Sequence, residues 1–159
     1  MIIEFTLNGN PQKVSVSSAE RAVDVLASQC GIGSVSANCL QGACGSCMIL
    51  LDGNPAYSCM LPAFSLRDRT VDTLERFQKT KEFAVLSSEM QKEGIDMCCA
   101  GESAPMLLAL HLAEHSISPS EADIRDALSN AHCDCIAPEQ FVHAVQSAVH
   151  RLDTARKAP

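Results

Sequence analysis

Aromatic and basic side chains are scarce in this sequence of 159 residues, which has no Trp, one Tyr and five Phe. It also has no long hydrophobic run and no basic stretch ahead of an apolar one near its start, so we expect neither a membrane span nor a secretory signal. We therefore expect a cytoplasmic protein. With 12 Lys and Arg against 19 Asp and Glu, the net charge of −7 is unsuited to holding a phosphate backbone. Nucleic acid is excluded as an expected partner.

One long stretch carries no charge at all. No Asp, Glu, Lys or Arg occurs from Val25 to Leu51, although 19% of the chain is charged. This gap fits a buried helix followed by an uncharged loop. It fits equally a surface that a partner protein covers, because the cores of interfaces are depleted of charged residues.

Cysteine, by contrast, is abundant, with nine residues in the chain. The odd count and the reducing compartment expected here argue against a disulfide framework and favour metal binding. Cys30 stands apart, and we interpret it as an inert buried thiol near a helix end. The other eight fall into three groups: Cys39, Cys44, Cys47 and Cys59, then Cys98 and Cys99, then Cys133 and Cys135.

The pattern along the chain predicts an α+β protein. Alternating apolar residues around two Gly-containing turns, at 8–11 and 52–54, indicate hairpins in the first half. The second half has helical periodicity, and Ser120 with Asp123 three residues later is typical of a capped helix start. We predict a mixed α+β domain over 1–76 and a helical bundle over 77–159. The expected strands are 2–7, 13–17, 48–51, 56–59 and 69–73, and the expected helices are 22–28, 79–92, 104–115, 120–129 and 138–152.

The stretch CLQGACGSC, residues 39–47, holds three cysteines and two glycines with C-x4-C-x2-C spacing, and Cys59 follows later. Zinc sites usually present two C-x2–4-C pairs. Three close thiolates plus one remote thiolate is instead the plant-type arrangement for a 2Fe-2S cluster. We therefore predict that such a cluster binds Cys39, Cys44, Cys47 and Cys59.

A hairpin can return the remote cysteine to the other three. If residues 52–54 form a three-residue loop, Cys47 and Cys59 lie opposite each other on paired strands. Gly42 and Gly45 then provide positive φ angles in a tight loop and close approach of backbone N–H groups to the cluster sulfurs. Such donors offset the negative charge of a cluster and tune its potential.

Two segments carry a family resemblance. NCLQGACGSCMILLDGNPAYSC, residues 38–59, resembles the first-cluster segment of the small iron-sulfur subunits of molybdenum hydroxylases, the xanthine dehydrogenase, aldehyde oxidoreductase and carbon monoxide dehydrogenase family. ISPSEADIRDALSNAHCDC, residues 117–135, resembles the stretch ending in that family's second-cluster C-x-C pair. The resemblance covers nearly the whole chain. It implies a ferredoxin-like β-grasp domain, then a four-helix bundle domain that binds a second 2Fe-2S cluster.

The resemblance also implies a function. Such a chain is the non-catalytic, electron-transfer subunit of an oxidoreductase, and no catalytic residue is expected in it. It relays electrons from a molybdopterin-binding large subunit towards an FAD-binding subunit of the same complex, or towards an external acceptor. Carried over by position, the four cysteines from Cys39 to Cys59 hold the outer cluster, and Cys133 and Cys135 supply two ligands of the inner one.

The other half of the inner site departs from the family pattern. Where the family has Gln-Cys-Gly-x-Cys, residues 97–101 read MCCAG, so Gly101 stands at the second ligand position. Adjacent side chains on a helix point about 100° apart, so Cys98 and Cys99 can both serve only in an irregular turn, which Gly101 permits. We predict that turn ahead of a helix from Ala104. The predicted inner ligands are Cys98, Cys99, Cys133 and Cys135.

Several alternatives stay open at this point. In one alternative the inner site is vacant, which leaves a one-cluster carrier whose helical half only docks a partner. In another, His132 completes the inner cluster in place of a thiolate. Otherwise the four inner cysteines hold structural zinc. HLAEH, residues 111–115, also matches the H-x-x-E-H pattern of zinc metalloproteases, against a simpler interpretation as two histidines on a polar helix face.

Overall fold

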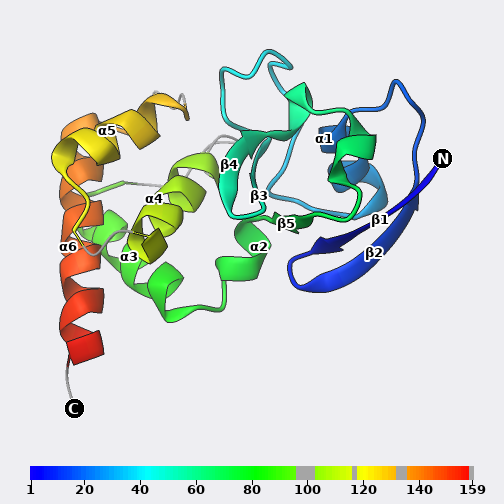
Figure 1. The fold of residues 1–159 in the computed structure, drawn as a ribbon. Coiled ribbons are helices and arrows are strands. Elements are labelled where there is room, and N and C mark those ends of the chain that lie inside the picture. Colours follow the sequence, from blue (N-terminus) through cyan, green and yellow to red (C-terminus); the bar gives the residue numbers. More distant parts are fainter. Residues whose placement is uncertain (96–102, 116–117, 132–135, 158–159) are drawn as a thin grey trace.

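A computed structural model describes residues 1–95, 103–115, 118–131 and 136–157. The molecule has a sheet-containing half and a helical half that lie side by side, with the two chain ends at opposite extremes (Figure 1). The described residues thus form an α+β fold, as the sequence predicts.

Five strands form one mixed sheet. They are β1 (Ile2–Leu7), β2 (Asn10–Ser15), β3 (Met48–Leu51), β4 (Asn54–Tyr57) and β5 (Thr70–Asp72). The strand order is β2-β1-β5-β3-β4. Only the β1–β5 pair is parallel among these strands, and the other neighbours run antiparallel.

Two-residue turns close both hairpins. Asn8 and Gly9 have φ angles of 51° and 80°, and Asp52 and Gly53 have φ angles of 50° and 80°. Positive φ at both central residues is the turn type that matches the natural twist of paired strands, and Asn-Gly and Asp-Gly favour it strongly. The three-residue loop predicted at 52–54 is therefore wrong, because Asn54 already pairs with Leu51 in the sheet.

Short helical segments cover one face of the sheet. They are α1 (Ala22–Asp24), the π-helical η1 (Val25–Gln29) and the 3-10 segments η2 (Ser58–Met60) and η3 (Ala63–Leu66). Alternation along β1 directs every second side chain towards these segments and leaves Ile2 and Glu4 exposed. The resulting core, called the sheet core below, includes Ile3, Phe5, Leu7, Val23, Leu26, Ile49, Leu51 and Val71.

The helical half contains α2 (Leu74–Phe77), α3 (Lys81–Lys92), α4 (Ser103–His115), α5 (Glu121–Ser129) and α6 (Pro138–Lys157). The four longer helices coincide with the predicted ones, although α6 continues to Lys157 rather than ending at Leu152, and the short α2 was not predicted. The predicted cap is confirmed: Ser120 accepts from the Asp123 amide at 3.2 Å while the Asp123 carboxylate accepts from the Ser120 amide at 2.8 Å. None of the described helices combines the length and apolar character that crossing a membrane requires.

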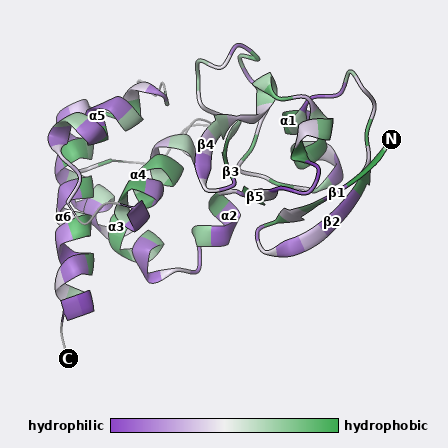
Figure 2. Ribbon diagram, viewed as in Figure 1, coloured by the Kyte–Doolittle hydropathy of each residue, from purple (hydrophilic) through white to green (hydrophobic). Residues whose placement is uncertain are grey.

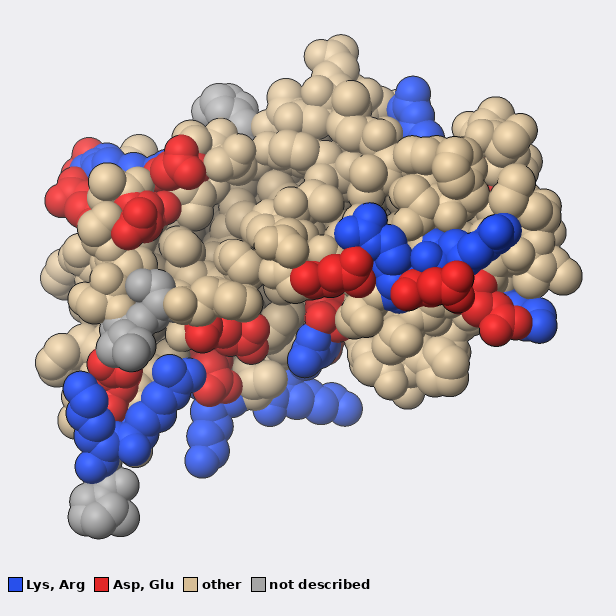
Figure 3. Space-filling view, viewed as in Figure 1, with Lys and Arg blue, Asp and Glu red and all other residues tan. Residues whose placement is uncertain are grey.

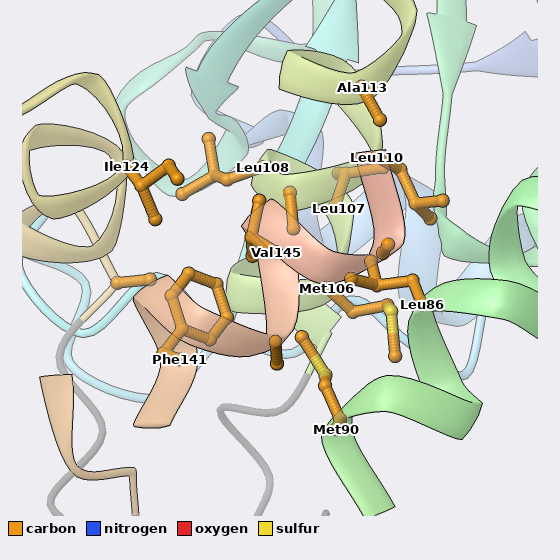
Figure 4. Close-up of a cluster of buried hydrophobic side chains, with 14 of the residues drawn as sticks. Leu86, Met90, Met106, Leu107, Leu108, Leu110, Ala113, Ile124, Phe141 and Val145 are labelled. Carbon is orange, nitrogen blue, oxygen red and sulfur yellow. The ribbon is translucent and has the colours of Figure 1, made fainter. Parts of the chain in front are cut away.

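The helix α4 lies at the centre of the second core, called the helical core below. It is hydrophobic around most of its circumference, whereas α5 and α6 alternate between hydrophobic and hydrophilic faces (Figure 2). Side chains from α3, α4, α5 and α6 converge there, as Figure 4 shows. The fully buried members include Met90, Met106, Leu107, Leu110, Ile124, Phe141 and Val145.

Strand β3 belongs to both cores. Met48 and Leu50 pack in the helical core, whereas Ile49 and Leu51 pack in the sheet core. All four residues of the strand are buried, because helices cover one face of it and the short segments cover the other. The last residues of the loop that enters β3, 45–47, are buried where the two halves meet, whereas most of residues 37–43 are exposed.

Candidate metal centre

The structure places the four outer cysteines around the start of β3. Cys39, Cys44 and Cys47 lie on the segment between η1 and β3, and Cys59 lies in η2. Cys47 and Cys59 are buried, whereas Cys39 and Cys44 are partly exposed. Below, the segment 38–47 is called the cysteine loop.

The hairpin returns Cys59 to the loop by a route other than the predicted one. Met48 pairs with Tyr57, so the residue opposite Cys47 is Ser58, whose amide donates to the Cys47 carbonyl at 3.1 Å. The predicted pairing of Cys47 with Cys59 across the ladder is therefore wrong, because the turn has two residues rather than three. The 3-10 turn of η2 then brings the Cys59 side chain into contact with that of Cys47.

Backbone N–H groups of the loop point at the Cys39 sulfur. The Cys44 amide lies 3.4 Å from Cys39 Sγ and the Gln41 amide lies 3.5 Å from it. These donors, joined by the Ala43 amide, lower the pKa of Cys39 to about 6. Hydrogen bonds to the charged form favour it, so the loop is built to hold a thiolate here.

Cys47 has the opposite electrostatics. Its pKa is raised to about 12, chiefly by burial and also by the neighbouring Cys59 and Cys44 side chains, against a Cys59 backbone hydrogen bond that lowers it. A buried thiolate without a cation is unfavourable, whereas bound iron supplies the missing positive charge. Cys47 is therefore a neutral thiol when no metal is bound, and it suits a thiolate ligand only where a cation is bound beside it.

Left-handed backbone shapes the loop. Gly42 and Gly45 have φ angles of 67° and 79°, and Leu40 between the cysteines has a φ angle of 57°. Successive N–H groups in such conformations form a concave anion site. The positive φ expected of both glycines is confirmed, and it explains how several amides face one sulfur.

At Gly45 the close approach is to the helical half. A Cβ built on Gly45 would lie 2.9 Å from Ala104 Cβ and 3.1 Å from Ala131 Cα. The 2.9 Å distance to Ala104 is shorter than real Cβ contacts allow. At Gly42 the nearest atom is Met60 Cγ, 3.2 Å away on a flexible side chain. At Gly45, therefore, the loop can lie this close to α4 and to a residue just after α5 because glycine has no side chain.

The donor set fits a 2Fe-2S cluster. Within the described residues, no three His, Cys, Asp or Glu side chains converge as ligands of a single metal ion. A binuclear cluster instead takes two thiolates on each iron. Cys39 lies beside Cys44, and Cys47 lies beside Cys59. These four thiols, with the N–H groups around Cys39, would hold such a cluster.

The predicted inner ligands Cys98, Cys99, Cys133 and Cys135 lie outside the described residues, as does His132. The described chain ends and resumes close to the cysteine loop, because Ala104 and Ala131 both contact Gly45. The helix expected from Ala104 begins at Ser103, one residue earlier.

The remaining candidates behave differently. Cys30 is only partly buried, and burial raises its pKa. The rings of His111 and His115 on α4 lie with centroids 4.3 Å apart and planes tilted by 38°. Burial, and then repulsion from His115, lowers the pKa of His111. His115 Nδ1 lies 2.9 Å from the His111 carbonyl. Among the described residues no third ligand joins the two histidines, so the metalloprotease interpretation gains no support.

Sequence reasoning missed Tyr57. Its ring packs against both the sheet core and the helical core, and its hydroxyl donates to the Asn130 carbonyl at 2.8 Å. Burial raises its pKa, and the four outer cysteines raise it further. Only one signal was visible beforehand, namely that the single Tyr of the chain stands two residues before a predicted ligand.

Comparison with known proteins places the chain in a family. Residues 5–100 match the family described as 2Fe-2S iron-sulfur cluster binding domain. The nicotinate dehydrogenase small FeS subunit of Eubacterium barkeri is 27% identical over 149 residues, which cover 94% of this chain and 95% of that protein. A probable xanthine dehydrogenase subunit of Bacillus subtilis (strain 168) is 30% identical over 82% of this chain and 75% of its own length.

A solved structure agrees with these relatives. The crystal structure of quinoline 2-oxidoreductase from Pseudomonas putida 86 contains a chain that superposes with a TM-score of 0.87. The two chains are 25% identical, and the match covers 99% of this chain and 98% of that one. Together with the four cysteines around β3, these matches show that the chain belongs to the 2Fe-2S iron-sulfur cluster binding domain family, as an iron-sulfur subunit of the molybdenum hydroxylase type.

Proposed function

We propose that this chain is the electron-transfer subunit of a molybdenum-hydroxylase-type oxidoreductase and carries two 2Fe-2S clusters. The outer cluster binds Cys39, Cys44, Cys47 and Cys59. The inner one binds Cys98, Cys99, Cys133 and Cys135 in a helical domain of the four-helix type. The geometry of the cysteine loop carries the proposal. Two backbone amides on its left-handed turn lie 3.4 and 3.5 Å from Cys39 Sγ, and the buried pair Cys47 and Cys59 lies beside this turn.

The protein surroundings tune what the outer centre does. When bound, a 2Fe-2S cluster supplies a one-electron redox couple. N–H groups at Cys39 stabilise negative charge on one side, and burial at Cys47 and Cys59 excludes water on the other. Hydrogen bonds to sulfur and solvent exposure are the two levers that set such potentials, so this chain applies both at one site.

An uncharged patch lies on the more exposed side of this centre, next to Glu20 and Arg21. Leu40 is 40% exposed, Met60 is 60% exposed and Phe64 is 43% exposed. In the space-filling view, the loop that protrudes at the top of the molecule shows no Lys, Arg, Asp or Glu (Figure 3). This loop belongs to the uncharged stretch 25–51. Uncharged, partly aromatic surface is typical of the core of an interface, which supports a docking role for this rim.

The partners follow from the relatives. The nicotinate dehydrogenase relative is named as a small FeS subunit, a name that implies larger subunits beside it. We propose that a molybdopterin-binding subunit delivers electrons to the inner cluster and that an FAD-binding subunit or external acceptor receives them at the uncharged rim. None of the five described cysteines forms a disulfide, which suits a reducing compartment, and we propose the cytoplasm.

Iron analysis with electron paramagnetic resonance (EPR) tests the clusters. We expect about four irons per chain and two paramagnetic signals after reduction, whereas two irons would mean a one-cluster carrier and zinc would mean a structural site. Cys44→Ser should abolish or grossly alter one signal. Cys30→Ser is the matched control and should leave both signals intact. An unchanged spectrum in Cys44→Ser would overturn the assignment of the outer ligands.

Native mass spectrometry of the iron-loaded chain tests the partners. We expect copurification with a larger polypeptide, because a carrier without a catalytic subunit has no source of electrons. Met60→Ser and Phe64→Ser should weaken capture of the acceptor subunit, whereas Ile2→Ser, 62% exposed on β1, should not. Equal capture by all three variants would contradict docking at the rim.

A further inference from the structure

The segment that leads into the cysteine loop has no regular structure. From residue 30 to residue 47 the chain forms neither helix nor strand. Such a segment must satisfy its backbone groups one by one, because no helix or sheet ladder does so. The Ser36 amide donates to the Ser46 carbonyl at 2.9 Å, and this bond closes the neck of the loop. Two predicted ligands lie between these residues in the chain, and Cys47 follows directly after them.

The two sides of this neck are held by different means. On the side that leaves the loop, residues 45–47 are all buried and continue into β3. On the side that enters the loop, Val35 is buried, whereas residues 31–34 and 36–38 are partly or fully exposed. Packing therefore fixes the leaving side along its length but the entering side at a single point. The position of the entering side depends on its hydrogen bonds.

Glu75 accepts hydrogen bonds from two of the three polar groups of Ser34 on this entering side. It lies in the first turn of α2, and one carboxylate oxygen accepts from the Ser34 amide at 2.8 Å. The other oxygen accepts from the Ser34 hydroxyl at 2.6 Å. The remaining group, the Ser34 carbonyl, accepts from the Ser103 hydroxyl of α4 at 2.7 Å. Ser34 is thus held from both halves of the molecule, and mainly by one carboxylate.

Glu75 is itself held by buried groups. The hydroxyl of Thr73, a fully buried residue, donates to the Glu75 carboxylate at 2.6 Å. Asn8, in the turn between β1 and β2, accepts from the Thr73 amide at 2.8 Å and donates to the Thr73 hydroxyl at 2.9 Å. Burial would raise the pKa of Glu75, but the hydrogen bonds from Ser34 and Thr73 outweigh it and lower the pKa below the ordinary value of 4.5. At neutral pH the carboxylate is therefore ionised, and hydrogen bonds to an ionised acceptor are stronger than neutral ones.

We propose that Glu75 is a positioning residue of the outer centre, which holds Ser34 and thereby fixes where Cys39 lies relative to the buried Cys47. The stretch 25–51 has no Asp or Glu, so a carboxylate that fixes this segment must come from another element, and α2 supplies it. The inference rests on the outer cluster of the proposed function, and it holds whether the chain carries one cluster or two. It assigns Glu75 no bond to iron and no redox step.

Glu75→Gln tests the inference because it keeps the size of the side chain and replaces one acceptor oxygen by a group that cannot accept. In the iron-loaded protein we expect unchanged iron content and faster hydrogen exchange at the Ser34 and Ser36 amides. Release of outer-cluster iron to a chelator should be about tenfold faster, which is the scale of one hydrogen bond to a charged group. The EPR signal that Cys44→Ser abolishes should broaden, because Cys39 no longer keeps one position.

Glu89→Gln provides the matched control. Glu89 is a buried carboxylate in α3 that accepts from Lys92 and Arg151, and within the described residues it makes no hydrogen bond to the cysteine loop or to the segment before it. Its substitution should lower stability and leave the outer signal and the release of iron unchanged. A loss of charge or of stability alone would affect both variants alike. Equal signals and equal release rates in Glu75→Gln and Glu89→Gln would therefore overturn the positioning role.

Ser34→Ala approaches the same contact from the other side and leaves the net charge unchanged. It removes the hydroxyl donor but keeps the amide bond to Glu75, so the outer signal and the release of iron should change in the same direction by a smaller amount. With Glu75→Gln added, the effect on release should be smaller than the product of the two single effects, because the substitutions share one contact. If Glu75→Gln does not assemble, Ser34→Ala decides the question, and an unchanged signal and release rate in it overturn the positioning role.

The outcomes separate this inference from the proposed function. If the unsubstituted protein binds no iron, or if Cys44→Ser leaves its spectrum unchanged, the outer centre and the positioning role fall together. If the unsubstituted protein has the outer signal, and Glu75→Gln and Ser34→Ala both keep its shape and its rate of iron release, the positioning role alone falls. A broadened signal and faster release with intact iron content support both.

Discussion

The sheet core and the helical core are assembled by different means. In the sheet core, two Asx-Gly turns fix the strand register, and alternation along β1 and β3 selects which side chains are buried. In the helical core, α4 is apolar on nearly all sides, and three helices and one face of β3 surround it. Local turns set the hairpins of the first core, although β1 also pairs with the distant β5, whereas the second core depends throughout on contacts between distant segments.

The difference matters because the cysteine loop enters β3 where the two cores meet, at residues 45–47. Its shape comes from its own left-handed residues, but Gly45 rests on the first turn of α4 and on Ala131. A defect in the helical core should therefore reach the loop without changing any residue in it. The predictions that follow test whether the two cores act as one unit.

The largest effect is expected from Phe141→Ala. Phe141 is fully buried in the helical core, and removal of a buried aromatic side chain leaves a cavity. The free energy of unfolding should fall by about 3–5 kcal/mol, measured by urea denaturation of the iron-loaded protein. Phe64→Ala, at a residue 43% exposed, should change it by no more than about 0.5 kcal/mol. Two separate unfolding transitions in Phe141→Ala would contradict the expectation that the two cores unfold as one cooperative unit.

Substitutions on the two faces of β3 sharpen the comparison. Ile49→Ala opens the sheet core and Leu50→Ala opens the helical core, and each should cost about 2–5 kcal/mol. Cys47 and Cys59 pack in the sheet core with Ile49. Ile49→Ala should therefore release iron to a chelator faster than Leu50→Ala does. Equal release rates would mean that the site senses global stability rather than the core that contains its ligands.

The sequence carried enough information for the elements whose signals are local. Asn8-Gly9 and Asp52-Gly53 mark both hairpins, and Ser120 with Asp123 marks the start of α5. The error at 52–54 came from counting Asn54 as a loop residue, although the turn is complete after two residues with positive φ. One residue of register then changed the partner of Cys47 from Cys59 to Ser58.

Contacts between distant segments could not be read from the sequence. Spacing alone predicted a cluster loop with glycines, but not that Gly45 meets Ala104 and Ala131, which lie far along the chain. The bond from Tyr57 to Asn130 joins residues 73 positions apart, and no local pattern encodes it. The ligand roles of the eight cysteines stay predictions that the iron and EPR measurements test.

The smallest effect is expected at the N-cap of α5, where the Ser120 cap and the Asp123 carboxylate hydrogen-bond each other. Ser120→Ala removes a hydroxyl that accepts from the Asp123 amide and donates to the Asp123 carboxylate at 2.7 Å. Loss of such a cap costs about 1 kcal/mol in the free energy of unfolding. Thr80→Ala is the matched control, because Thr80 caps α3 through the Phe83 amide at 3.2 Å with no reciprocal acid at that position.

The two caps should differ in their dependence on pH. The side-chain and backbone hydrogen bonds of Ser120 hold the pKa of Asp123 below its ordinary value of 3.8. A lowered pKa contributes stability above pH 3.8, and this contribution is lost as the pH falls through the folded-state value. The cost of Ser120→Ala should therefore shrink below pH 3.8, whereas that of Thr80→Ala stays constant. Acid effects on the rest of the chain are common to both variants, so parallel curves would rule out the coupling between Ser120 and Asp123.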